Sequence, residues 1–230
     1  MITVVIPTFN AGAGLAATFA ALIPASVEGL ISRAIVVDGG STDQTHAIAD
    51  DAGARIIHGQ KGRGIQLAKG GEEVETPWIL FLHADTILMP GWEVDVRSFI
   101  AAASDQGALK QAAVFRFKVD EPGLRPRIME KIVALRCALF ALPYGDQGLL
   151  ISTKFYRQIG GYRPLPLMED VEIIRRIGRR HLSLLRSSAL TSFARYRQDG
   201  YFRRIFRNLT CLALYFAGVA PAKIVQRYDK

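Results

Sequence analysis

The stretch "PWILFLHADT" (residues 77–86) begins with a run of bulky apolar side chains and ends in an imidazole and a carboxylate. An uninterrupted apolar run of this length predicts a strand buried on both faces, as in a parallel sheet covered by helices on each side. Ligands of open α/β sheets bind beyond the carboxyl ends of the strands. His83 and Asp85 follow this strand directly, so we expect them to lie at a binding site.

Further apolar runs occupy the first half of the chain, and segments with helix start and stop signals separate them. The predicted strands are 2–6, 33–40 and 54–59. The predicted helices are 13–22, 41–53 and 61–71. This alternation predicts an α/β fold with a mostly parallel central sheet and helices on both faces.

The second half has a different pattern. Residues 112–119 alternate, with Phe115, Phe117 and Val119 on one face, which predicts a half-exposed and antiparallel strand. A loop that runs into a strand is expected at 143–152. Amphipathic helices are predicted at 127–142, 167–180 and 201–225. Since no linker interrupts these elements, we expect a single domain over 1–230.

Composition limits the class of protein. Half of the residues are hydrophobic, which excludes a disordered chain. Cys137 and Cys211 lie far apart and lack metal-ligand spacing, so a disulfide framework or zinc site is not expected, and a reducing cytoplasm fits best. No signal peptide is visible, and no apolar run reaches the roughly 20 residues that a bilayer requires.

The net charge of +8 is concentrated in arginines of the C-terminal third. Such a field favours a nucleic acid, an anionic lipid or a phosphorylated substrate, although a solvated helix face would show the same pattern. The predicted helix at 201–225 carries Arg203, Arg204 and Arg207 beside apolar residues. It is therefore expected either to lie on an anionic membrane surface or to pack on 127–142 or on a second copy in a homodimer.

Small, acidic and cationic residues gather in the loops that follow the first four predicted strands. These loops are 7–10, 38–43, 59–64 and 83–85. Because the strands are parallel, the loops are expected at one edge of the sheet. Asp43 as a helix cap, and Gly39 and Gly40 as a turn, are the purely structural alternatives.

Several of these segments resemble the family 2 glycosyltransferases, whose fold is the Rossmann-like GT-A fold. The similar segments are "VVIPTFN", "IVVDGGSTDQT", "FLHADT" and "MEDVE". A finer resemblance, to the bacterial subgroup called rSAM/selenodomain-associated glycosyltransferases, rests on "GRGIQLAKG", "PYGDQG" and "LPLMEDVE". The resemblance covers nearly the whole chain. It implies a nucleotide-sugar-binding half (1–110), an acceptor and catalytic half (111–200) and a helical tail (201–230).

The resemblance also implies a donor site. Asp85 corresponds to the family's metal ligand, which holds Mn²⁺ or Mg²⁺ against the leaving diphosphate. The first acid of that motif is replaced by His83, a ligand that suits Mn²⁺ better than Mg²⁺. Asp38 matches the base-binding acid and favours a UDP-linked donor. The implied donor-binding residues are Pro7, Thr8, Asn10, Asp38, Lys61, Arg63, Gly64, Ala84 and Asp85.

On the acceptor side, Asp170 matches the family's catalytic base, and inversion in one step needs only one such carboxylate. Glu169 and Asp170 could instead only complement a helix dipole. The implied acceptor-side residues are Gly145, Asp146, Gln147 and Glu169. Arg195 and Arg197 stand where the family has a phosphate-binding segment, but its spacing and its tryptophan are not reproduced.

The sequence thus predicts a metal-dependent, inverting glycosyltransferase that uses a UDP-sugar and an unidentified hydroxyl acceptor. It is expected in the cytoplasm, peripherally at the membrane and without nucleic acid. One alternative is a nucleotidyltransferase, although no cation stands in the loop after the first strand. A second is a non-catalytic protein that binds anionic lipid or nucleic acid, which leaves Asp38, Asp85 and Asp170 without a role.

Overall fold

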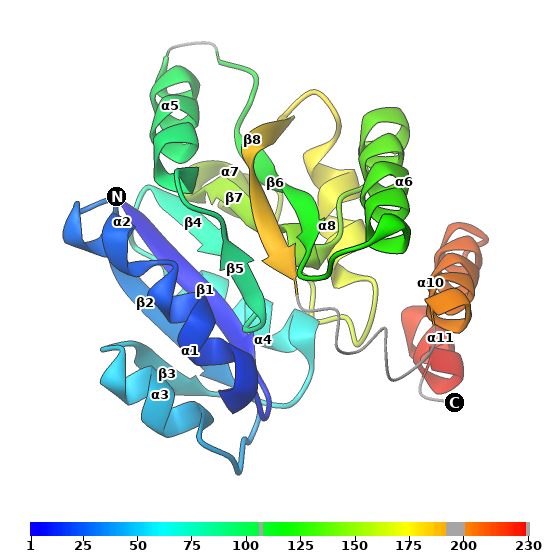
Figure 1. Ribbon diagram of the computed structural model, residues 1–230, viewed down its shortest axis with the longest axis horizontal. Coiled ribbons are helices and arrows are strands. Elements are labelled where there is room, and N and C mark those ends of the chain that lie inside the picture. Colours follow the sequence, from blue (N-terminus) through cyan, green and yellow to red (C-terminus); the bar gives the residue numbers. More distant parts are fainter. Residues whose placement is uncertain (106–107, 192–200, 229–230) are drawn as a thin grey trace.

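The computed structural model describes residues 1–105, 108–191 and 201–228 (Figure 1). The strands are β1 (Ile2–Thr8), β2 (Ile31–Asp38), β3 (Arg55–His58), β4 (Trp78–Phe81), β5 (Thr86–Leu88), β6 (Ala112–Val119), β7 (Leu149–Ser152) and β8 (Leu182–Thr191). The helices are α1 (Gly12–Ala20), α2 (Ile23–Val27), α3 (Thr45–Asp51), α4 (Arg63–Glu72), α5 (Trp92–Ser104), α6 (Leu124–Phe140), the 3₁₀ turn η1 (Gly145–Gln147), α7 (Thr153–Gln158), α8 (Glu169–Ile177), α10 (Tyr201–Phe216) and α11 (Pro221–Tyr228).

The strands form one eight-stranded sheet in the order β3-β2-β1-β4-β7-β6-β8-β5. The first four are mutually parallel. β7 then pairs antiparallel with both β4 and β6, and β8 runs parallel to β6 but antiparallel to β5. The predicted α/β class is confirmed. The parallel part of the sheet consists of β1 to β4, which are the strands predicted from the apolar runs.

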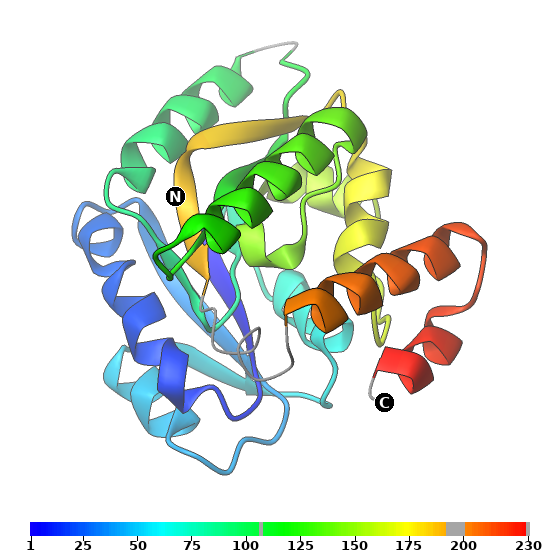
Figure 2. The same ribbon diagram turned by 45° about the vertical axis from the view of Figure 1, so that its right-hand side comes forward.

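Helices cover both faces of the sheet (Figures 1 and 2). Ile2, Val4 and Ile6 of β1 pack on the face with α1, α2, α3 and α5. Val5 of the same strand packs on the opposite face with α4, α7 and α8. Both cores therefore need apolar side chains from every central strand, which explains why β1 and β4 are continuous apolar runs.

The alternation at 112–119 predicts β6 correctly, since Phe115, Phe117 and Val119 are buried while Arg116 is exposed. Its neighbours are mixed: it is antiparallel to β7, as expected, and parallel to β8. The predicted tail helix divides into α10 and α11 at Gly218, whose φ of +85° an L-residue rarely adopts. Among the described helices, none combines the length and apolarity needed to cross a membrane.

The sheet places the site because β1, β2 and β4 end at one edge. Thr8, the last residue of β1, pairs in register with Asp38, the last residue of β2. Val5 pairs with Phe81 at the end of β4, so that the chain after Phe81 turns toward the same edge. The loops expected to meet there do so.

Candidate active site

A cleft of about 650 Å³ opens at the carboxyl edge of the parallel strands. This volume falls within the range of about 300–1,000 Å³ that is common for small-molecule sites. The cleft is lined by most of the predicted donor-side residues, namely Pro7, Thr8, Asn10, Lys61, Arg63, Ala84 and Asp85, together with His83. The structure thus brings together residues that are separated by up to seven helices and strands in the sequence, since α1 to β4 lie between Pro7 and Asp85.

Asp38 lies behind the wall of this cleft and is completely buried. Its Oδ1 accepts hydrogen bonds from the hydroxyls of Thr8, at 3.0 Å, and Ser41, at 2.5 Å. Its Oδ2 accepts from the backbone N–H groups of Gly40 and Ser41, at 2.9 and 2.8 Å. Burial alone would raise the pKa of Asp38, but the hydrogen bonds from Ser41, His46 and Gly40 outweigh it and hold that pKa well below its usual range.

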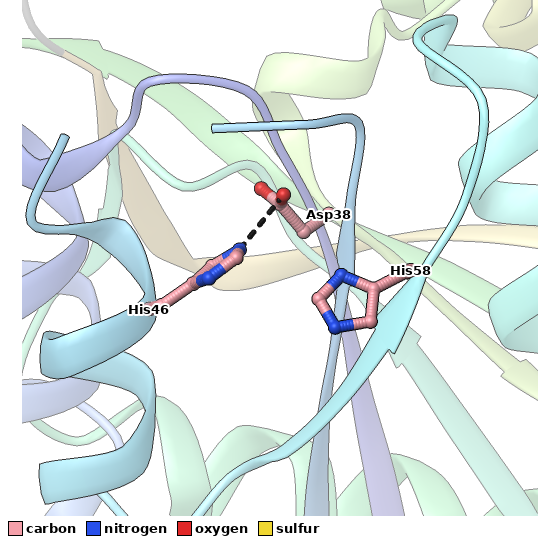
Figure 3. Close-up of side chains that lie close together, drawn as sticks. All are labelled: Asp38, His46 and His58. Carbon is pink, nitrogen blue, oxygen red and sulfur yellow. Dashed lines mark hydrogen bonds and ion pairs between the residues drawn. The ribbon is translucent and has the colours of Figure 1, made fainter. Parts of the chain in front are cut away.

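Two imidazoles lie beside Asp38 (Figure 3). His46 of α3 has its Nε2 2.9 Å from Oδ2 of Asp38, and His58 ends β3 with its ring centroid 5.4 Å from that of His46. One ligand atom from each of these three residues lies within 4.8 Å of the others, a spacing that a metal ion can bridge. The predicted metal ligand, Asp85, lies instead in the cleft, among different residues.

Hydrogen bonds join the loops after β1 and β2. The N–H of Asn10 donates to Ser41 Oγ, and the N–H of Thr42 donates to Asn10 Oδ1, at 2.8 and 2.9 Å. Asp43 accepts from the N–H groups of both Gly12 and Thr45. Asp43 is therefore more than a local cap: it ties the start of α3 to the start of α1.

Lys61 and Arg63 enter the cleft from the start of α4. The ammonium of Lys61 lies 3.9 Å from the ring centroid of Phe9, a cation–π contact. Nη1 of Arg63 lies 3.5 Å from Oε1 of Glu169, so this arginine links the cleft to the start of α8. Both cations thus contact residues that line or adjoin the cleft, rather than only solvent.

Gln66 also lines the cleft, and the sequence interpretation missed it. Its Nε2 donates to the carbonyl oxygens of Thr8 and Val37, at 2.7 and 2.6 Å, and its side chain is buried. It therefore fixes the ends of β1 and β2 beside the cleft. A signal was available, since a glutamine one turn after Arg63 in a glycine-rich helix start points the same way as that arginine.

Gly64 does not line the cleft. A Cβ at this position would collide with the backbone oxygen of Leu165, in the segment that leads into α8. Only glycine lets α4 and the backbone at Leu165 approach each other so closely. Its position therefore joins α4 to the segment before α8.

On the predicted acceptor side, the carboxylate of Asp170 is oriented by two backbone donors. Its Oδ2 accepts from the N–H of Gly145 at 3.0 Å, and its Oδ1 accepts from the N–H of Val171 at 2.7 Å. A Cβ on Gly145 would lie 2.6 Å from Nε2 of His83. His83 lines both the cleft and the small pocket that contains Glu169 and Asp170, so it forms the boundary between them.

The neighbouring acids have raised proton affinities. Burial raises the pKa of Glu169 to about 7, the charge of Asp170 adds to the rise, and Arg63 opposes it. Burial also raises the pKa of Asp146 to about 6 against the opposing charge of Arg136, with Asp170 and Asp85 adding to the rise. Titratable groups shifted toward neutrality in this way gather at functional sites.

Gln147 is buried and structural in its contacts. Its Nε2 donates to the carbonyl oxygen of Phe115 at 2.9 Å, and its Oε1 accepts from the N–H of Tyr144 at 3.3 Å. It thereby holds η1 against β6 and places Gly145 beside Asp170. The predicted phosphate ligands Arg195 and Arg197 lie outside the described residues.

The chain is similar to known glycosyltransferases. A family model described as "Glycosyl transferase family 2" matches residues 3–141. Glycosyltransferase AglJ of Haloferax volcanii is 31% identical over 86 residues, which are 36% of this chain and 27% of that protein. A PGL/p-HBAD biosynthesis glycosyltransferase of Mycobacterium tuberculosis is 33% identical over 115 residues, 44% of this chain and 41% of that protein. The matched regions thus cover less than half of these curated relatives.

Solved structures share the fold. S. aureus TarS 1–349 in complex with UDP-GlcNAc has a TM-score of 0.62 at 16% identity, over 83% of this chain and 58% of that one. Glucosyl-3-phosphoglycerate synthase from Mycobacterium tuberculosis, in complex with Mn²⁺, UDP-glucose and phosphoglyceric acid, has a TM-score of 0.57 at 21% identity, over 80% and 68%. These structural neighbours are GT-A glycosyltransferases, and the expected fold is confirmed.

Proposed function

Since the chain belongs to glycosyl transferase family 2, we propose that it transfers a sugar from a UDP-sugar to a hydroxyl acceptor, with inversion at the anomeric carbon and with a divalent cation. The observation that supports this proposal most directly is that the cleft and the small pocket with Asp170 adjoin each other. A cleft of about 650 Å³ with Asp85 in its wall adjoins, across His83, a pocket that holds the oriented carboxylate of Asp170. A donor and a base are needed on two sides of one reacting carbon, and this arrangement provides both.

The donor side has groups of the required chemistry. Lys61 and Arg63 line the cleft and can neutralise a diphosphate. The solved neighbours support a uridine nucleotide, because those proteins were crystallised with UDP-GlcNAc or UDP-glucose. Asp38 is completely buried and both of its oxygens accept hydrogen bonds from Thr8 or from the loop at 39–41, so we propose that it holds these groups in the shape that receives the base. This is a positioning role, in place of the direct contact with uracil that the resemblance implies.

The residues present fit a divalent cation. Burial is the main cause of the raised pKa of Asp146, and Asp170 and Asp85 lie close enough for their charges to add to the rise, so three carboxyl groups converge at this point. Carboxylate oxygens suit Mg²⁺ and Mn²⁺, and we propose Asp85 as the protein ligand, with His83 beside it. The cation, when bound, supplies neutralisation of the leaving diphosphate. Asp38 is a weaker choice, since its Oδ2 already accepts from the N–H groups of Gly40 and Ser41 and a metal would have to replace its hydrogen bond with His46.

We propose that Asp170 is the base. The acceptor oxygen attacks the anomeric carbon, its proton passes to Asp170, and the bond from that carbon to the diphosphate oxygen breaks with its electron pair leaving on the diphosphate. One displacement inverts the carbon. The N–H groups of Gly145 and Val171 hold the carboxylate in place for this transfer. Glu169, buried and paired with Arg63, is left to shape the pocket.

The proposal is tested by incubating the protein with a panel of nucleotide sugars, with Mn²⁺, with Mg²⁺ or with EDTA, and measuring the nucleotide released. Release of UDP that requires the cation supports it. Release of pyrophosphate would point to the nucleotidyltransferase alternative. Binding of nucleic acid or lipid without any binding of UDP and metal would point to the non-catalytic alternative.

We also propose that the protein acts in the cytoplasm with weak affinity for anionic membranes through its tail. Cys137 and Cys211 are both free thiols, in keeping with a reducing compartment. Leu209 and Phe216 of α10 remain half-exposed. Flotation with anionic liposomes should show binding that falls as salt is raised, because exposed charges are screened within about 8 Å at physiological ionic strength. If no binding to the liposomes is seen at low salt, the proposed affinity for membranes is wrong.

A further inference from the structure

A second cavity, of about 610 Å³, lies between α6 and α10 on the acceptor side. Its walls are almost entirely apolar and include Ile132, Leu135 and Leu139 of α6 and Leu209, Leu212 and Phe216 of α10. Phe117, Met129 and Val133, from the small core between β6 and α6, also line it. We call this cavity the apolar groove.

The walls of the apolar groove are poorly buried for side chains of this kind. Ile132, Leu135 and Leu139 are 58%, 58% and 57% exposed, and each repeats on the same side of α6 at helical spacing. Leu209 faces the groove from α10 with 56% of its surface exposed. Contiguous exposed apolar surface on a soluble domain usually marks a binding site, because leaving it in water costs free energy.

One end of the apolar groove is polar and adjoins the proposed reaction centre. Arg136, Tyr144 and Asp146 line it there, and the guanidinium of Arg136 lies 3.5 Å from the centroid of the Tyr144 ring. Tyr144 also lines the small pocket that contains Glu169 and Asp170. The groove and the proposed base therefore share a wall.

At this junction Asp146 has an unsatisfied hydrogen-bond acceptor among the described residues. Its Oδ1 is buried and has no hydrogen-bond partner among the described residues. A buried carboxylate oxygen without a donor is costly, and such atoms are rare in folded proteins. A ligand that offers an O–H group here removes the cost.

We propose that the apolar groove binds the hydrocarbon part of an amphiphilic acceptor, whose hydroxylated head group donates one hydrogen bond to Asp146 and presents a second hydroxyl to Asp170. This rests on the proposed function for the identity of the reaction, and it adds the class of acceptor: a lipid-like molecule with a hydroxylated head. The hydrocarbon binds by removal of apolar surface from water, while the head group fixes which oxygen reacts.

The test uses 1-O-alkylglycerols with butyl, hexyl, octyl and decyl chains as probes, below their aggregation limits, by titration calorimetry at pH 8 without donor. The affinity should rise about threefold to fourfold for each added methylene, as expected for burial of hydrocarbon. Affinity independent of chain length overturns the proposal. The di-O-methyl ether of the decyl compound lacks O–H donors and should bind about tenfold more weakly. This difference should shrink to below about threefold in Asp146→Asn, since a neutral amide oxygen is the weaker acceptor; a difference that persists overturns the role of Asp146.

Paired variants on one helix separate the groove from its surroundings. Leu135→Gln with Leu139→Gln changes the groove wall at exposed positions, where folding tolerates polar residues, and should weaken the decyl probe by about tenfold or more. Leu124→Gln with Ile128→Gln lies on the same side of α6 but outside the groove, and should leave binding within about twofold. Equal losses in both pairs mean that the probe lies on the outside of α6, and overturn the proposal.

The outcome is distinguishable from failure of the proposed function. If the protein cleaves UDP-sugars but binds no alkylglycerol, the proposed function stands and the proposed acceptor site in the groove is wrong. A protein that binds alkylglycerols with the expected chain-length dependence but cleaves no nucleotide sugar retains the groove as a lipid site and loses the function together with the acceptor role.

Discussion

Two aspartates, the buried Asp38 at the proposed donor side and the half-buried Asp146 at the proposed acceptor side, differ in how the protein satisfies their hydrogen bonds. Asp38 accepts hydrogen bonds on both oxygens from β1, from its own loop and from α3. Asp146 has a buried oxygen with no hydrogen-bond partner in the described chain. Accordingly the pKa of Asp38 is lowered, because its hydrogen bonds outweigh its burial, whereas burial raises that of Asp146 to about 6.

The difference indicates that the two parts of the candidate site are formed to different degrees before a ligand binds. At Asp38 the protein completes the hydrogen bonds itself, so we expect the loops around Asp38 to keep their shape before a ligand binds. On the acceptor side it leaves polar and apolar groups unsatisfied, so that part of the site is completed by the ligand. The following predictions alter one side at a time, from the largest expected effect to the smallest.

Asp170→Asn should remove the base and leave the donor side intact. We expect turnover to fall by about 10²–10⁴-fold, the usual contribution of general base catalysis, with UDP affinity unchanged. Steady-state UDP release and calorimetry with UDP and Mn²⁺ measure the two quantities. Normal turnover would transfer the role to Asp146 or Glu169.

Asp85→Asn should act on the donor side. The affinity for UDP in Mn²⁺ is expected to fall by about tenfold or more, because a neutral amide is a poorer ligand for a hard cation, whereas the affinity in EDTA should not change. His83→Ala is the matched variant at the same strand end, and its loss should be smaller. If Asp85→Asn and the wild type show the same metal dependence, Asp85 is not the ligand.

Asp38→Ala should destabilise the fold by about 2–4 kcal/mol, since it leaves several buried donors without an acceptor. Folding lowers the pKa of Asp38 below its ordinary value of 3.8, so its stabilisation is complete above that pH and declines as the pH falls below it. The difference between wild type and variant in the free energy of unfolding, measured with urea, should therefore become smaller in acid. Asp50→Ala, an exposed acid on α3, is the control and should show no such narrowing.

Glu169→Gln should give the smallest effect, and one of opposite sign. Folding raises the pKa of Glu169 from 4.5 to about 7, so the folded state holds more protons and loses stability as the pH rises between these values. The amide removes this cost. The melting temperature of the variant should exceed that of the wild type by a few degrees at pH 8 and approach it at pH 5. An equal difference at both values of pH would contradict the assignment.

The parallel half of the fold could be predicted because β1, β2 and β4 are buried on both faces and therefore appear as continuous apolar runs. β5 and β8 were not predicted: β5 has only three residues, and β8 mixes buried Leu185 and Ala189 with exposed or half-exposed neighbours. Their place depends on pairing across long stretches of sequence, which local pattern does not encode.

The place of the candidate site could be predicted where a single residue stands at a strand end, as with Thr8 and Asp85, and where family motifs mark it, as with Asp170; the roles of these residues stay predictions. Gln66 and the apolar groove were not predicted. Gln66 acts by reaching two strand ends at once, and the groove exists only because α6 and α10 approach each other in space. The groove has no local sequence signature. The position of Gln66 one turn after Arg63 is such a signal, but it does not show which strand ends the side chain reaches.

The antiparallel β7 has a consequence for how the chain is made. β4 pairs with β1 on one side and with β7 on the other, and all four of its residues are buried in the finished sheet. During synthesis β1 to β4 emerge well before Leu149–Ser152. Until β7 arrives, β4 presents an apolar edge with unpaired backbone groups, to which another nascent chain can add a strand. Truncations that end between 82 and 148 should therefore aggregate, and a chaperone that shields strand edges should matter most during this interval.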